Sequence, residues 1–157
     1  MSQTIAPAAI RKSFTVRATP ERAFEVFTAG LHRWWPKSHS IGDAPLKMAT
    51  IEPRVGGRWY SLTEDGVEHE WGDVLAWEPP ARLILAWRLN GAFTYDPDLL
   101  TEVEVCFAAT GEGETRVDFE HRGLERFGAG EAVQAIRGGM DQGWGLILDA
   151  FQTVADA

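Results

Sequence analysis

Residues 129–155 read AGEAVQAIRGGMDQGWGLILDAFQTVA, and this stretch decides the fold. Large apolar side chains recur in it at steps of three and four residues, which predicts one long amphipathic helix. Glycines interrupt the pattern at positions 138, 139, 143 and 145, and each costs about 1 kcal/mol relative to alanine inside a helix. A free peptide of this sequence should therefore not be helical. The helix needs a covering surface, and its glycines mark places where a sheet can approach or where space can remain beside the helix.

The covering surface is predicted between residues 46 and 122, where one strand pattern follows another. Turn residues separate these strands, among them Asp65-Gly66, Pro79-Pro80 and Asn90-Gly91. Strands joined mostly by short turns form an antiparallel meander. With a first strand near the N-terminus, the sequence predicts seven strands, at residues 10–17, 47–53, 57–63, 67–78, 82–88, 101–109 and 114–121.

Two short helices are predicted between the first and second strands. Thr19 is a good N-cap, Pro20 suits the first helical position, and an apolar stripe follows over residues 23–27. A second helical turn is expected over residues 31–36. The simplest packing is an α+β fold in which a curved seven-stranded sheet wraps around the C-terminal helix and the short helices close one end.

Composition excludes several classes of protein. A chain of 157 residues predicts one domain spanning 1–157. The net charge of −8 disfavours nucleic acid and anionic membranes as partners. No apolar run approaches the roughly 20 residues of a membrane span, the N-terminus lacks the apolar segment of a secretory signal, and Cys106 has no second cysteine to pair with. We therefore expect a cytoplasmic protein.

Several short motifs occur in order along nearly the whole chain. They are Thr19-Pro20-Glu21-Arg22-Ala23-Phe24, Trp34-Trp35-Pro36, Glu52-Pro53-Arg54-Val55-Gly56-Gly57-Arg58-Trp59, Gly72-Asp73-Val74, Pro79-Pro80-Ala81-Arg82-Leu83 leading to Trp87, His121-Arg122-Gly123 and Gly143-Trp144-Gly145. Their order and spacing resemble the START-like (SRPBCC) superfamily, and within it the family named after the activator of heat-shock-protein-90 ATPase. The resemblance implies the helix-grip fold. It says less about function, because one fold hosts many functions.

The side-chain parity of the strands predicts which residues face the helix. An inward aromatic face forms either a filled core or a ligand cavity, and the family resemblance favours the cavity. The predicted cavity residues are Trp35, Trp59, Trp71, Leu85, Trp87, Val105, Phe107, Phe119, His121, Trp144 and Leu148.

Polar candidates are few, and each has a structural alternative. His121 lies on the apolar parity of a strand, where it is either a core residue or a group that contacts a ligand. The spacing of His69, Glu70 and Asp73 does not match a zinc signature, and Cys106 has no adjacent base. We therefore predict no metal, no cofactor and no assigned catalytic residue. His32 and His39 flank the Trp34-Trp35 pair, where they form either a pocket mouth or part of a solvated loop.

Three functions remain open at this point. The leading hypothesis is the binding or carriage of a small hydrophobic molecule. The second is a protein-interaction module, chaperone-linked as the family name implies, which requires a filled interior and exposed apolar side chains around Trp34 and Trp35. The third is an enzyme of the polyketide cyclase or hydratase type, which requires polar groups that converge on the cavity. An exposed outer sheet face would in addition permit a homodimer.

Overall fold

A computed structural model describes residues 7–39, 41–128 and 130–157 of the chain. The predictions that concern the first six residues and residue 129 lie outside these described residues. The strands are β1 (Ile10–Val16), β2 (Leu46–Ile51), β3 (Arg58–Thr63), β4 (Glu68–Glu78), β5 (Arg82–Trp87), β6 (Thr101–Gly111) and β7 (Glu114–Arg122). The helices are α1 (Pro20–Phe27), α2 (Leu31–Trp34) and α3 (Glu131–Asp156), with 3-10 turns η1 (Lys37–His39) and η2 (Leu124–Phe127).

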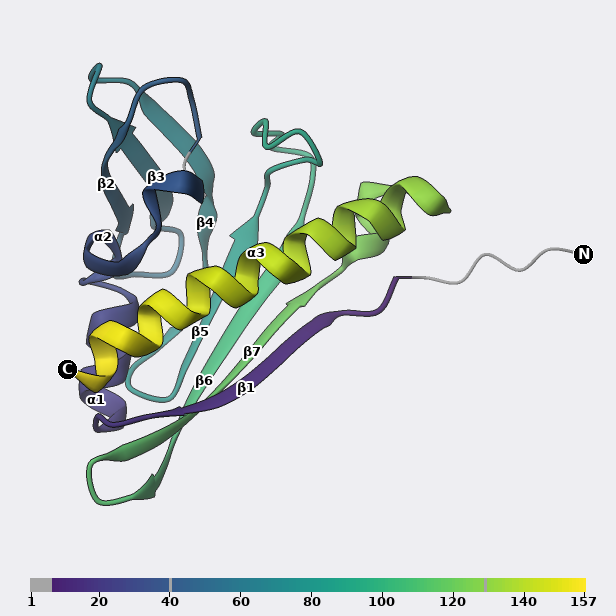
Figure 1. Ribbon diagram of the computed structural model, residues 1–157. Coiled ribbons are helices and arrows are strands. Elements are labelled where there is room, and N and C mark those ends of the chain that lie inside the picture. Colours follow the sequence, from purple (N-terminus) through teal and green to yellow (C-terminus); the bar gives the residue numbers. More distant parts are fainter. Residues whose placement is uncertain (1–6, 40, 129) are drawn as a thin grey trace, which may run out of the picture.

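The strands form one antiparallel sheet in the order β1-β7-β6-β5-β4-β3-β2. Figure 1 shows that the sheet curves and that α3 lies across its hollow side, with α1 and α2 at one end. The predicted helix-grip fold is confirmed, including the seven strands, the two short helices and the long C-terminal helix.

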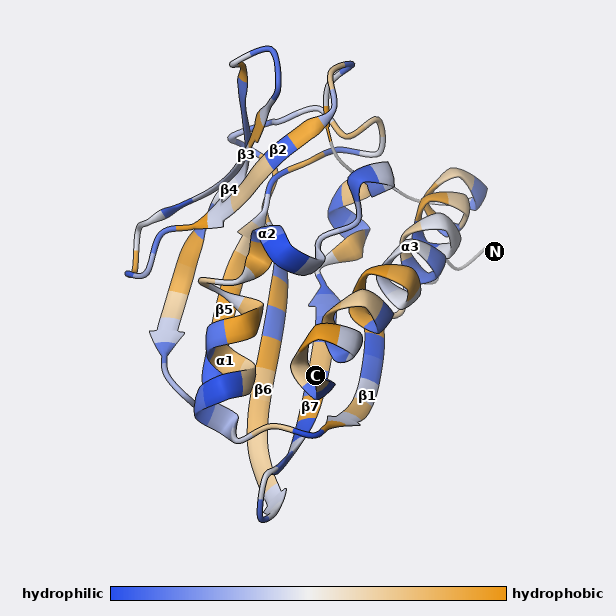
Figure 2. Cartoon of the chain, turned by 60° about the vertical axis from the view of Figure 1, so that its left-hand side comes forward, coloured by the Kyte–Doolittle hydropathy of each residue, from blue (hydrophilic) through white to orange (hydrophobic). Residues whose placement is uncertain are grey.

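Helix α3 is stabilised by what it buries. Figure 2 shows apolar residues on one side of this helix and hydrophilic ones on the other. Its buried residues are Val133, Met140, Trp144, Ile147, Leu148, Phe151 and Ala155. Burial of a large apolar side chain contributes about 1.5–3 kcal/mol, so several of them offset the cost of the glycines. Among the described residues, no helix is long and apolar enough to cross a membrane.

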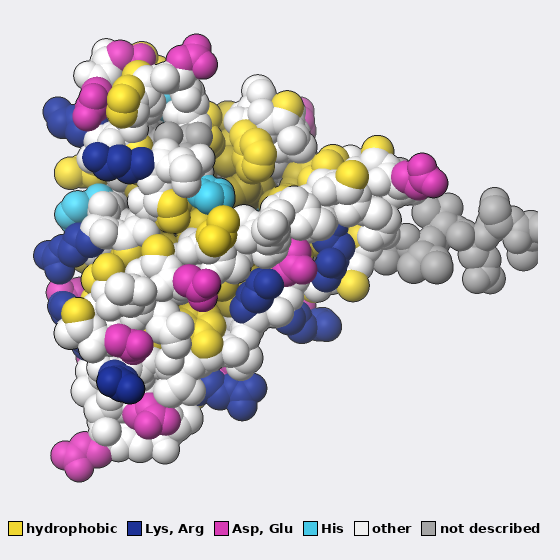
Figure 3. All heavy atoms as spheres, in the orientation of Figure 1, with side chains coloured by type: hydrophobic (Ala, Val, Ile, Leu, Met, Phe, Trp, Pro, Cys, Tyr) yellow, Lys and Arg dark blue, Asp and Glu magenta, His cyan; other side chains and the backbone are white. Residues whose placement is uncertain are grey.

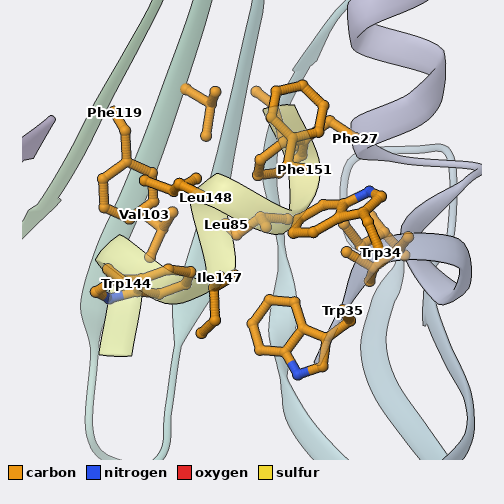
Figure 4. Close-up of a cluster of buried hydrophobic side chains, with 14 of the residues drawn as sticks. Phe27, Trp34, Trp35, Leu85, Val103, Phe119, Trp144, Ile147, Leu148 and Phe151 are labelled. Atoms are coloured by element: carbon orange, nitrogen blue, oxygen red, sulfur yellow. The ribbon is translucent and has the colours of Figure 1, made fainter. Parts of the chain in front are cut away.

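Aromatic rings fill the space between α3 and the short helices. The ring of Phe151 on α3 lies 5.1 Å from Phe27 of α1 and 5.2 Å from Trp34 of α2, measured between centroids. Figure 4 shows these rings and their neighbours Leu148 and Phe119 gathered in one cluster. Edge-to-face aromatic pairs add about 0.5–1.5 kcal/mol beyond the area they bury. These contacts fix the short helices against the C-terminal half of α3.

A bulge in β4 turns an extra side chain toward the interior. Trp59 of β3 pairs with Gly72, but the next residue, Tyr60, pairs with Glu70, so Trp71 is the additional residue in β4. Trp71 is 1% exposed. A Cβ atom at Gly72 would overlap the carbonyl oxygen of Ala86 on β5, so only glycine fits there. The bulge places Trp71 beside Trp59 in the core.

Side chains of α3 hold the outer edge of β1. The Lys12 ammonium lies 2.6 Å from the Asp141 carboxylate, the Gln152 amide donates to the Thr15 carbonyl oxygen at 2.8 Å, and Arg137 donates to the Ala8 carbonyl oxygen at 2.6 Å. The ion pair with Asp141 explains why Lys12 occurs among the alternating apolar residues of β1. These bonds also occupy part of a strand edge that would otherwise present unpaired backbone groups.

The face of the sheet that points away from α3 carries charged pairs. Arg122 bonds Glu102 and Glu104, and Arg88 bonds Asp73 with 2.6 Å between Nε and Oδ1. The ion pairs are partly exposed, so each contributes little to stability. Because charged side chains of both signs alternate on it, this face of the sheet is a solvated surface rather than a second core.

We expect Trp144→Ala to lower the free energy of unfolding by about 3–5 kcal/mol, as truncation of a large buried aromatic side chain does. Leu146→Ala is the matched control because Leu146 lies on the same helix but is 56% exposed, and its effect should stay within about 0.5 kcal/mol. Urea denaturation measures both variants. Equal losses of stability in Trp144→Ala and Leu146→Ala would show that burial of Trp144 does not hold α3 against the sheet.

Candidate functional site

A pocket of about 340 Å³ lies beside the middle of α3. Figure 3 shows apolar side chains gathered in a hollow between α3 and the ends of the strands. The lining also includes exposed residues, Phe93 and Gly139, so the pocket reaches the surface. Its walls are Trp35, Ser38, His39, Ile41, Gly42, Trp71, Trp87, Leu89, Ala92, Phe93, Gly139, Met140, Gly143, Trp144 and Ile147.

Indole rings dominate this pocket. Trp35 lies between Trp71 and Trp144, with centroid distances of 4.8 Å and 5.9 Å, and the Trp87 ring is 5.4 Å from that of Trp144. The rings come from the end of α2, the bulge in β4, the end of β5 and the middle of α3. Flat apolar walls of this kind suit a flat apolar ligand.

Two glycines of α3 leave the pocket open on the helix side. Gly139 and Gly143 are one helical turn apart and both line it. An added Cβ at Gly139 would meet no atom within 4 Å, and one at Gly143 would lie 3.7 Å from the His39 ring. The expected space beside the helix is therefore present at Gly139, whereas a Cβ atom at Gly143 would be in ordinary van der Waals contact with His39.

A short loop after β5 forms the rim. The Asn90 side-chain oxygen accepts hydrogen bonds from the backbone N–H groups of Ala92 and Thr94 at 2.9 and 3.0 Å. Phe93 between them adopts a φ of 58°, which is uncommon for a residue with a Cβ atom. Phe93 is also 52% exposed. The Asn90 side chain therefore fixes a turn that places an aromatic ring at the pocket mouth.

The polar atoms of the pocket are mostly engaged within the protein. Trp71 donates its indole N–H to Ser61 Oγ at 3.0 Å, and Trp87 donates to the Leu89 carbonyl oxygen at 3.1 Å. Trp35 donates to the backbone oxygen of His39 at 3.2 Å. Ser38 Oγ lies 2.9 Å from His39 Nδ1. Among the described lining residues, Ser38 and His39 are the two with polar side chains other than indole.

His121 is fully buried in a closed hydrogen-bond network next to the pocket. The Trp144 indole donates to Nδ1 at 3.1 Å, and Nε2 lies 2.8 Å from Thr101 Oγ1. Thr101 donates its own hydrogen to the Trp87 carbonyl oxygen at 2.9 Å, so Nε2 carries the ring proton and donates it to Thr101. Burial lowers the pKa of His121 from 6.5 to about 3. Both ring nitrogens are occupied, which favours the core role over a ligand contact.

Trp59 stands behind the pocket wall. Its ring packs against those of Trp71 and Trp87, at 5.3 and 5.5 Å. Its indole N–H is buried and has no hydrogen-bond partner among the described residues. A buried donor without a hydrogen-bond partner lowers the stability of the folded protein, because its lost hydration is not replaced.

The structure divides the predicted cavity residues into two groups. Trp35, Trp71, Trp87 and Trp144 line the pocket. The remaining predicted residues are buried in the surrounding core and are not part of the described lining: Trp59, Leu85, Val105, Phe107, Phe119, His121 and Leu148. Sequence reasoning missed the rim residues Leu89 and Phe93, for which Asn90-Gly91 signalled only a turn.

Other polar candidates lie away from the pocket. Glu70 pairs with Arg58, and Asp73 pairs with Arg88, on the outer face of the sheet. The pKa of the half-buried Cys106 thiol is raised by burial and by Glu104, which opposes a nucleophilic role. Within the described parts of the chain, no three His, Cys, Asp or Glu residues are grouped to hold a metal ion.

Comparison with known proteins gives one family match and many structural ones. The model of the family described as "Activator of Hsp90 ATPase homolog 1-like protein" matches residues 17–156. No protein of curated function matches the chain.

Two of the similar solved structures have 38% sequence identity to the chain. One is an anthrahydroquino-gamma-pyrone synthase, Txn09, whose alignment covers 98% of this chain and 99% of that one with a TM-score of 0.67. The other is CalC of Micromonospora echinospora, a self-sacrificing resistance protein, with 94% of both chains covered and a TM-score of 0.72. Protein MLL2253 of Mesorhizobium loti, at 22% identity and a TM-score of 0.67 over 95% of this chain and 97% of its own, shows the fold alone.

The His121 network predicts a pH-dependent stability. Between pH 6.5 and about 3 the unfolded chain binds a proton that the folded chain does not. The free energy of unfolding should therefore fall with decreasing pH, by up to about 1.4 kcal/mol per pH unit from this group. We expect His121→Phe to remove that slope and to cost about 1–3 kcal/mol at neutral pH, because the Trp144 N–H loses its acceptor.

Urea unfolding from pH 7 to about 5 tests this expectation. His32→Gln is the control, since His32 is exposed on α2, and it should keep the wild-type slope. An unchanged slope in His121→Phe would contradict the assignment of a neutral, structural imidazole.

The two neighbouring tryptophans Trp59 and Trp71 allow a matched comparison. Both lose the same atoms on mutation to phenylalanine, but only Trp71→Phe breaks an indole hydrogen bond. We expect Trp71→Phe to be more destabilising than Trp59→Phe by about 1 kcal/mol, as measured by thermal or urea unfolding. A larger loss for Trp59→Phe would show that its N–H has a partner in solution.

Proposed function

This chain belongs to the family of Activator of Hsp90 ATPase homolog 1-like proteins, and from that premise we propose that it binds a small aromatic molecule in the tryptophan-walled pocket. The observation that carries the proposal is the pocket itself, about 340 Å³ in volume and walled by four indole rings. Small-molecule sites in proteins have volumes of about 300–1,000 Å³ and mostly apolar linings with few polar groups.

The shape of the pocket supports a flat ligand with fused rings. Trp35 and Trp144 meet nearly edge to face, with 88° between their planes. The open corner between two such rings offers one face for stacking and one edge for a perpendicular contact. Because α3 contributes Gly139 and Gly143 here rather than longer side chains, a ring system can lie against the helix backbone.

One of the similar proteins, Txn09, supports the same class of ligand. Txn09 is an anthrahydroquino-gamma-pyrone synthase, and anthrahydroquinones and pyrones are flat ring systems. Its 38% identity extends over nearly the full length of both chains. We propose a ligand of related shape for this chain and leave its substituents open.

A cyclase-like enzyme is the second candidate. One specific observation favours it: the Ser38 hydroxyl and the His39 imidazole meet at the pocket wall, 2.9 Å apart. Binding or carriage stays the leading proposal. His121, the histidine whose pKa is lowered by burial, is enclosed in the core with both ring nitrogens hydrogen-bonded, so it does not favour a catalytic role. The protein-interaction hypothesis required a filled interior and exposed apolar side chains around Trp34 and Trp35. The pocket opposes a filled interior, and the two tryptophans themselves are only 4% and 5% exposed.

Adjacent glycines of α3 provide a test of the pocket. Gly138 and Gly139 are both exposed, and an added Cβ meets no atom within 4 Å at either, but only Gly139 lines the pocket. We expect Gly139→Leu to weaken the binding of 9,10-anthraquinone at least tenfold by occupying the site, and Gly138→Leu to leave it unchanged. Both variants should be at least as stable as wild type, because leucine has a helix propensity about 1 kcal/mol better than glycine.

Equilibrium dialysis gives the dissociation constants, and thermal unfolding checks stability. Equal affinity in all three proteins would place the ligand elsewhere. No binding of the probe to the wild-type protein would remove the support for an aromatic ligand.

A further inference from the structure

We infer that His39 is the residue through which the pocket recognises an acidic hydroxyl group, a phenol or an enol, on its aromatic ligand. The inference rests on the proposed function and adds to it the polar contact and the chemical class of the substituent.

The indole groups are not available to a ligand. Each of the four lining tryptophans already donates its N–H within the protein: Trp35 to the His39 carbonyl oxygen, Trp71 to Ser61, Trp87 to the Leu89 carbonyl oxygen and Trp144 to His121. A ligand that used one of these donors would have to break an existing hydrogen bond of the protein. The remaining polar side chains of the described lining are Ser38 and His39.

The imidazole of His39 has one engaged nitrogen and one that faces α3. Nδ1 lies 2.9 Å from Ser38 Oγ. Nε2 has no hydrogen bond within the described parts of the chain, and it would lie 3.8 Å from a Cβ atom built on Gly143. Because Gly143 has no side chain, a ligand against the helix can reach Nε2.

The turn that carries His39 is held in place from two sides. The Trp35 indole bonds the His39 backbone oxygen at 3.2 Å, and the His39 N–H donates to the Pro36 carbonyl oxygen at 3.0 Å. Trp35 itself is a wall of the pocket. The histidine is therefore positioned by the same ring that would stack on the ligand.

An acidic hydroxyl gains most from this arrangement. In the tautomer that carries its hydrogen on Nδ1, His39 donates to Ser38 Oγ, and the Nε2 lone pair accepts the ligand's O–H hydrogen. When the proton transfers, the ligand's O–H bond breaks and an N–H bond forms at Nε2, leaving an imidazolium beside a phenolate or enolate. This charge-assisted bond is about twice as strong as a neutral one, whereas a ketone oxygen has no proton to give and lacks that gain.

Two anthraquinones that differ by one hydroxyl group test the inference. We expect wild-type protein to bind 2-hydroxyanthraquinone about tenfold more tightly than 9,10-anthraquinone. In His39→Phe this ratio of affinities should fall to about one. His32→Phe is the matched control, because His32 is exposed on α2 and does not line the pocket, and it should keep the wild-type ratio. Ser38→Ala should give an intermediate ratio.

Absorption spectra provide a second readout. At a pH where free 2-hydroxyanthraquinone is protonated, the probe bound to wild-type protein should show its red-shifted phenolate band, and the probe bound to His39→Phe should not. A hydroxyl preference that persists in His39→Phe overturns the inference and leaves the proposed function intact. An equal loss of affinity for both probes in that variant also overturns the inference, since His39 would then only shape the pocket. If neither probe binds the wild-type protein, the proposed function and the inference fall together.

Discussion

Helix α3 is stable only while its apolar side is buried, and the rest of the molecule supplies that cover. The curved sheet holds the helix on its hollow side, and the short helices α1 and α2 close the end that the strands leave open. Phe151, Leu148 and Trp144 make the buried contacts along the helix. The opposite requirement, space for a ligand, is met where the helix has glycines in place of large side chains.

One polar path crosses this apolar interface. It runs from the Trp144 indole to His121, from His121 to Thr101, and from Thr101 to the Trp87 backbone. It joins α3 to β7, β6 and the end of β5, and it orients the indole ring of Trp144. Buried networks of this kind, when fully satisfied, favour one packing over similar alternatives. The register of the helix on the sheet is therefore specified by directional bonds as well as by hydrophobic contact.

The fold could be predicted from the sequence because its signals are local. Strand alternation, turn residues and the three- and four-residue steps of α3 each agree with the final structure. The site was predicted only in part, for two physical reasons. Parity shows that Phe119 and Trp87 face inward, but it cannot show which inward residues touch one another and which border a space. The rim depends on the turn fixed by Asn90, which brings Phe93 to the pocket through a backbone conformation that no periodicity indicates.

The tryptophan cluster also makes the optical properties of this protein collective. The Trp35 and Trp71 rings are 4.8 Å apart with 48° between their planes, and Trp59 follows at 5.3 Å from Trp71. Indole transition dipoles at such separations couple, so light absorbed by one ring is shared with its neighbours. We therefore expect the circular dichroism of the folded chain to contain an aromatic contribution in the region normally assigned to the backbone. Helix content calculated from ellipticity alone would misjudge a protein whose secondary structure is intact.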